Sequence, residues 1–107
     1  MGMGLDMRYH GIDFPKKEIA AFCRKHGIRR LSLFGSVLRD DFSPRSDIDI
    51  LVEFKRGEVP SILGMVSMEA ELSKVIGHKV DLRTPAELSR HFRGKVLKEA
   101  KVQYVAA

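Results

Sequence analysis

The stretch that decides the fold is GSVLRDDFSPRSDIDILVEF, residues 35–54. Its second half, SDIDILVEF, alternates in the manner of a β-strand, whose successive side chains point to opposite faces. One face carries Ile48, Ile50, Val52 and Phe54, and the other carries Asp47, Asp49, Leu51 and Glu53. The pattern therefore predicts a strand with one apolar face and two carboxylates on the other.

Asp47 and Asp49 point to the same side of this strand and are separated by a rise of about 6.6 Å. Two such carboxylates repel each other, and without a counter-charge one of them takes up a proton. Their oxygens suit a hard divalent cation such as Mg²⁺ or Mn²⁺, and a pair of such ions serves in-line displacement at phosphorus. A D-x-D sequence alone is better explained by two acids on a solvated sheet face, so the neighbouring residues decide.

Two further features favour a phosphate site. Gly35 and Ser36 end the predicted strand 28–34 and precede a short helical turn, where backbone N–H groups and a hydroxyl can bind phosphate oxygens. Asp81 lies in KVDL, a third predicted strand, and can direct its carboxylate to the same place if this strand lies beside the first acidic one. Singly, these features also fit a plain turn and a strand-edge acid.

The remaining chain predicts helices between these strands. Pro15 to Gly27 and Ser61 to Ile76 have helical apolar spacing, and Gly77 ends the second helix. Thr84 to Glu87 form a capping box that predicts a third helix, which Gly94 divides from a last helix running to the end. The predicted fold is α/β (α+β), a small mixed sheet covered by helices on one face, in one domain spanning residues 1–107.

Composition excludes several other classes. The chain has 107 residues, 44% hydrophobic and 31% charged, and no run that approaches a membrane span. The first residues, MGMGLDMRYH, lack the apolar stretch of a signal peptide, and Cys23 is the single cysteine, so we expect a cytoplasmic protein. The net charge is +5, but no aromatic residues alternate with the basic ones, so we expect no direct nucleic-acid binding.

Together these residues resemble a known family. Gly35-Ser36, ten residues, and then Asp47-Ile48-Asp49 resemble the G-S-x10-D-x-D signature of the nucleotidyltransferase superfamily that includes DNA polymerase beta. Asp81 matches its late acid, and Arg39 matches an arginine often found three positions after the serine. The chain is most similar to the minimal nucleotidyltransferases of prokaryotes, from about residue 28 to residue 104.

The resemblance implies a mechanism and a site. Gly35, Ser36 and Arg39 would bind a nucleoside triphosphate, and ATP is the expected donor. Asp47 and Asp49 would hold the divalent ions, and Asp81 would complete the metal shell and assist the acceptor hydroxyl. A nucleoside monophosphate, AMP, would pass to that hydroxyl and pyrophosphate would leave.

The resemblance also implies a partner. Minimal nucleotidyltransferases of this kind resemble the antitoxin halves of pairs whose toxins are all-helical HEPN ribonucleases, and the expected acceptor is a toxin tyrosine. Alternatives remain open: a non-catalytic module that neutralises its partner by occlusion, or a small-molecule nucleotidyltransferase acting with a separate helical subunit. A basic nucleic-acid binder ranks last, because it leaves the three acids unexplained.

Overall fold

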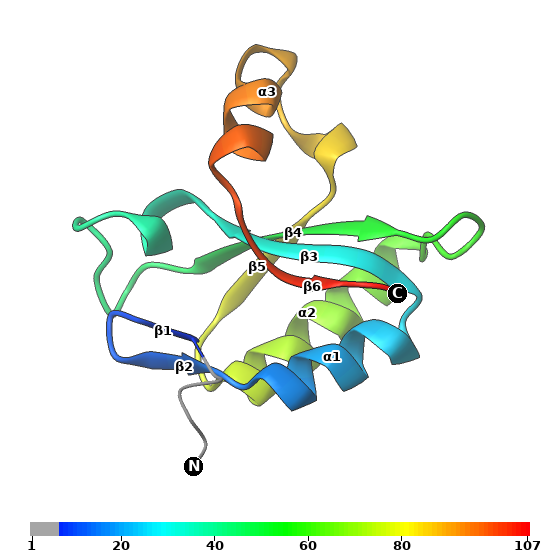
Figure 1. Cartoon of the computed structure of the whole chain (residues 1–107), viewed down its shortest axis with the longest axis horizontal. Coiled ribbons are helices and arrows are strands. Elements are labelled where there is room, and N and C mark those ends of the chain that lie inside the picture. The colour runs from blue at the N-terminus through cyan, green and yellow to red at the C-terminus, as the bar shows by residue number, and fades with distance from the viewer. Residues whose placement is uncertain (1–6) are drawn as a thin grey trace.

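The computed structural model describes residues 7–107 and has a mixed four-stranded sheet at its centre (Figure 1). The strand order is β5 (Val80–Arg83), β4 (Ile48–Phe54), β3 (Ile28–Phe34) and β6 (Lys101–Val105). The β4–β5 pair is parallel, whereas β3 is antiparallel to both β4 and β6. Strands β3 and β4 therefore lie inside the sheet, and the late acid lies on the edge strand β5.

Two helices cover one face of the sheet, as the sequence predicts. They are α1 (Lys16–Lys25) and α2 (Ile62–Ile76), which lie below the sheet in Figure 1. Helix α2 begins where the Ser61 hydroxyl accepts a hydrogen bond from the Gly64 N–H, and it ends at Gly77, whose φ of 79° is left-handed. The third helix, α3 (Arg90–Glu99), lies on the other side of the sheet and buries none of its residues.

The core fills the space between the sheet and these two helices. Ile48, Ile50 and Val52 of β4 are all fully buried there. The helices contribute Ile19, Phe22, Cys23, Met68, Leu72 and Ile76. Burial raises the pKa of the Cys23 thiol to about 12, so this cysteine is a core residue.

The C-terminal part differs from the sequence prediction. The capping box at Thr84 forms, but it opens a single 3₁₀ turn, η2 (Pro85–Glu87), because Leu88 returns to an extended conformation. Helix α3 starts later, with Ser89 as its N-cap, and passes through Gly94 without a break. The predicted last helix is wrong, since residues 101–105 form β6 and complete the free edge of β3.

The described part of the chain opens with a hairpin that the sequence did not predict. Strands β1 (Met7–Tyr9) and β2 (Ile12–Phe14) pair through a turn in which His10 and Gly11 have positive φ. Phe14 is 1% exposed and joins the core, so the hairpin is anchored to the domain. Among residues 7–107, no helix combines the length and hydrophobicity needed to cross a bilayer.

Candidate active site

Asp49 and Asp81 lie side by side on the sheet. The parallel register pairs Asp49 of β4 directly with Asp81 of β5, so their side chains leave the same face. This is the face opposite α1 and α2, because the neighbouring residues Ile48 and Ile50 point into the core. The adjacency that the sequence analysis left conditional is therefore present.

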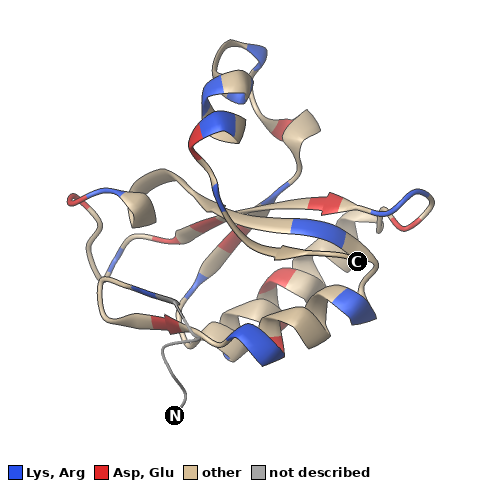
Figure 2. Cartoon of the chain, viewed as in Figure 1, with Lys and Arg blue, Asp and Glu red and all other residues tan. Residues whose placement is uncertain are grey.

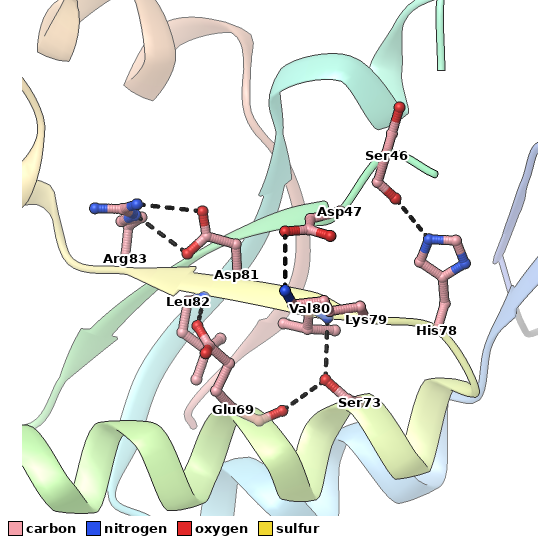
Figure 3. A network of polar contacts seen from close by, with 10 residues as sticks. All are labelled: Ser46, Asp47, Glu69, Ser73, His78, Lys79, Val80, Asp81, Leu82 and Arg83. Carbon is pink, nitrogen blue, oxygen red and sulfur yellow. Dashed lines mark hydrogen bonds and ion pairs between the residues drawn. The ribbon is translucent and has the colours of Figure 1, made fainter. Parts of the chain in front are cut away.

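Asp47 precedes β4 and completes the acidic group. Its position depends on the junction of two strands, where the Ile48 N–H donates to the Lys79 carbonyl at 2.9 Å. Beside it, His78 Nε2 donates to the Ser46 carbonyl at 2.7 Å (Figure 3). His78 also lies against the Phe42 ring, with ring centroids 5.6 Å apart. The residue before Asp47 is thus held by a side chain that belongs to the segment leading into β5.

Strand β5 is fixed by polar groups of α2 (Figure 3). As an edge strand it has outward N–H groups without a strand partner, and two of them find side chains on the helix. The Val80 N–H donates to Ser73 Oγ at 3.0 Å, and the Leu82 N–H donates to Glu69 Oε2 at 2.8 Å. These two bonds hold the backbone on either side of Asp81, and they therefore fix the position of Asp81 along the edge of the sheet.

Gly35 closes over Asp49. It has a φ of 77° and opens the 3₁₀ turn η1 (Gly35–Leu38) at the end of β3. A Cβ built on Gly35 would collide with Oδ2 of Asp49 and lie 3.2 Å from its Cγ. Glycine is therefore required on two grounds, backbone conformation and close approach, and the turn faces the acids.

The grouping of acids changes the titration of one of them. The pKa of Asp49 is raised by burial first, and then by the charges of Asp81 and Asp47, against lowering by Arg83 and Arg39. A carboxylate in this state gains stability from a proton or from a cation. All three predicted acids contribute to one electrostatic environment, which is the arrangement that the sequence pattern suggested.

Two of the acids are paired with basic side chains. Arg83 contacts both oxygens of Asp81, at 3.2 and 3.3 Å, and Lys79 Nζ lies 3.8 Å from Asp47 Oδ2. Both basic residues are exposed, so a ligand can displace them. Within residues 7–107, no three acidic, histidine or cysteine side chains already form a metal-binding group. The carboxylate set suits Mg²⁺ or Mn²⁺, and it is compensated by Arg83 and Lys79 in this conformation.

Two of the three predicted phosphate-binding residues line a cleft. Gly35 and Arg39 line a cavity of about 950 Å³ between η1 and α3. Arg39 is exposed and pairs with Asp41 at 3.3 Å. In the part of the chain that the structure describes, the Ser36 hydroxyl has no hydrogen-bond partner within the protein. Gly35 thus faces the acids and also borders this cleft.

Sequence reasoning missed several contributors to this region. Glu69 and Ser73 read as ordinary polar positions of α2, since only the strand pairing shows that they face the edge of β5. The residues of α3 that line the cleft were also missed, because only the folded structure brings α3 beside η1. A detectable signal was present in α3, where Phe92 and Val96 are four residues apart and Lys95 and Lys98 are three apart.

Comparison with known proteins gives close relatives. MJ0435 of Methanocaldococcus jannaschii, provisionally named a protein adenylyltransferase, is 41% identical over 85 residues, which cover 79% of this chain and 89% of the relative. The protein adenylyltransferase MntA of Thermococcus cleftensis is 36% identical over 84 residues, which cover 78% of this chain and 80% of the relative.

A solved structure shares the fold at lower identity. It is a tri-AMPylated Shewanella oneidensis HEPN toxin in complex with an MNT antitoxin, with a TM-score of 0.61 and 20% identity over 85% of this chain and 70% of that chain. The nucleotidyltransferase domain family matches residues 16–104, which include all six predicted site residues. On this match and these relatives, the chain belongs to the nucleotidyltransferase domain family and is a nucleotidyltransferase.

Proposed function

We propose that this protein transfers AMP from ATP to a tyrosine hydroxyl of a cognate HEPN toxin, and that it acts as an antitoxin. The observation that carries the chemistry is the meeting of Asp47, Asp49 and Asp81 beneath the Gly35 turn. The relatives named as protein adenylyltransferases support AMP as the transferred group. The complex of an AMPylated HEPN toxin with an MNT antitoxin supports a toxin as the acceptor.

The residues divide the work of the reaction. Gly35 and Ser36 offer backbone N–H groups and a free hydroxyl to the triphosphate, and Arg39 adds a positive charge. Asp47 and Asp49, with Asp81, would hold Mg²⁺ or Mn²⁺ after Lys79 and Arg83 release them. Bound there, such an ion neutralises negative charge on the reacting phosphates.

The bond changes balance with one proton transfer. The acceptor oxygen forms a bond to the α-phosphorus, the bond from that phosphorus to the bridging oxygen breaks, and pyrophosphate leaves with the electron pair. Asp81 accepts a hydrogen bond from the attacking hydroxyl and takes up its proton. Its place beside Asp49 on β5 brings a base to the face where the phosphate binds.

The test incubates the protein with ATP, Mg²⁺ and its cognate HEPN protein and then measures the intact mass of the HEPN protein. We expect one or more added AMP groups with the wild type. Asp47→Asn and Asp49→Asn together should lower the rate about 1,000-fold, because the charges that organise the transition state are lost. No AMP on the HEPN protein, with a folded enzyme that binds it, would refute the proposal.

The same variants distinguish transfer from occlusion. Toxin neutralisation that disappears with the two substitutions, while the complex still forms, supports transfer. Neutralisation that survives them favours a non-catalytic binding module. Helix α2 makes that comparison necessary, because Ile62 and Leu63 at its start are 84% and 81% exposed and offer an apolar surface to a partner.

A further inference from the structure

The cleft between η1 and α3 carries more positive charge than the signature residues supply. Its lining includes Arg39 from the end of η1, Lys95 and Lys98 from α3, and Lys101 at the start of β6, against one acid, Glu99. Figure 2 shows the basic residues of α3 on the side of the sheet opposite α1 and α2. The cleft therefore gathers cations from two segments that are far apart in the sequence.

Three of these basic residues are lysines that carry exposed charges. Throughout residues 7–107, no acidic side chain forms an ion pair with Lys95, Lys98 or Lys101, and all three lysines are exposed. By contrast, Lys25, Arg29 and Arg83 each pair with a carboxylate. Unpaired cations gathered around one cleft repel one another, so an anionic ligand would stabilise them.

The cleft walls strengthen any such attraction. Leu38 of η1 lines the cavity together with Leu88, Phe92 and Val96 from residues 88–96. Apolar walls lower the local dielectric and leave charges at their rim less screened than on an open surface. The volume of about 950 Å³ exceeds what a single phosphate group requires.

Resting on the proposed function, we infer that Lys95, Lys98 and Lys101 bind the β- and γ-phosphates of the donor and then the pyrophosphate that leaves. Gly35 carries the inference, because it lies against Asp49 on one side and borders this cleft on the other. If the acids hold a divalent cation that binds the α-phosphate, the rest of the triphosphate would extend past Gly35 toward the lysines. An acidic segment of the partner protein would also match the positive charge of the cleft. It would not explain why Gly35 contacts both the cleft and Asp49.

Pyrophosphate binding, measured by calorimetry on the intact protein, tests this inference. The double variant Lys95→Gln with Lys98→Gln should bind pyrophosphate about tenfold more weakly, since each exposed charge contributes a few-fold effect. Lys17→Gln, an exposed lysine on α1, is the matched control and should change binding by less than about twofold. Binding of AMP, which lacks the distal phosphates, should be the same in all three proteins.

The outcomes separate this inference from the proposed function. Wild-type affinity for pyrophosphate in the double variant overturns the inference, even if AMP transfer is observed. Weaker binding of the HEPN protein with unchanged pyrophosphate binding also overturns it, and assigns the cleft to the partner. Lysine-dependent pyrophosphate binding without AMP transfer upholds the inference and refutes the proposed acceptor instead.

Discussion

The two faces of β4 are built from alternate residues of one strand, yet they have opposite properties. Ile48, Ile50 and Val52 are 0% exposed against α1 and α2. On the other face Asp49 lies beside Asp81, and burial, followed by repulsion from the charges of Asp81 and Asp47, raises the pKa of Asp49. One face lowers the free energy of the fold, and the other holds like charges together. The face that carries Asp49 also includes Leu51, which is 1% exposed, so the contrast applies to the acidic end of that face. There the acids supply the chemistry, while the opposite apolar face stabilises the fold.

The largest effect on stability should come from the buried face. Ile50→Ala removes apolar contacts from a fully buried site and should lower the free energy of unfolding by about 3 kcal/mol. Denaturant unfolding measures this, with Ile50→Val as the matched control at about 1 kcal/mol. At a temperature where the variant stays folded, AMP transfer should be preserved. A large loss of AMP transfer in the folded variant would contradict the assignment of stability to one face of β4 and activity to the other.

On the acidic face, Gly35→Ala should act mainly on activity. The added methyl group collides with the Asp49 carboxylate and displaces it, and a misplacement of this kind costs about 100-fold in rate. Gly57→Ala is the control, because Gly57 has a similar φ of 81° but open space around its Cβ. Equal AMP transfer by the two variants would show that the contact between a Gly35 Cβ and Asp49 does not control activity.

The smallest effect has an unusual sign. Because the raised pKa means that the folded state binds the Asp49 proton more tightly than the unfolded chain, stability at this group is lost as pH rises through the folded pKa. Asp49→Asn should therefore stabilise the metal-free protein at neutral pH, by roughly 0.5 kcal/mol after allowance for solvent screening. The gain should shrink as pH falls toward 3.8, the ordinary aspartate value.

Urea unfolding of both proteins across this pH range measures the difference. A variant that is less stable than the wild type at neutral pH would contradict the assignment of Asp49 to a group of repelling acids. A gain that does not change with pH would attribute it to packing instead of charge.

The sequence predicts the two inner strands well. Period-two alternation locates β4, and the predicted strand 28–34 has the bounds found for β3. Both strands could be predicted from local sequence patterns. The helices that bury their apolar residues could likewise be predicted from helical apolar spacing. The acids could also be predicted from the sequence. Burying a charged residue inside an apolar strand costs free energy, so such residues indicate a functional site.

The structure of the C-terminal segment could not be predicted from local pattern. Residues 95–105 have good helix formers at the start, and the pattern continues without a proline or glycine. Val102, Tyr104 and Val105 favour a strand, but the free edge of β3 decides the outcome, and that is a tertiary property. The lysines of the cleft meet Gly35 and Arg39 only because this segment folds back along β3, so the sequence alone does not bring them together.

The central claim is that Asp47, Asp49 and Asp81 gather to hold a divalent cation. Thermal unfolding with and without Mg²⁺ or Mn²⁺, for the wild type and the double variant Asp47→Asn with Asp49→Asn, tests it without a partner or nucleotide. At ten times the dissociation constant, the ion should stabilise the wild type by about 1.4 kcal/mol, seen as a higher Tm, and leave the variant unchanged. An equal rise in both proteins, or none in the wild type up to millimolar ion, would contradict the account.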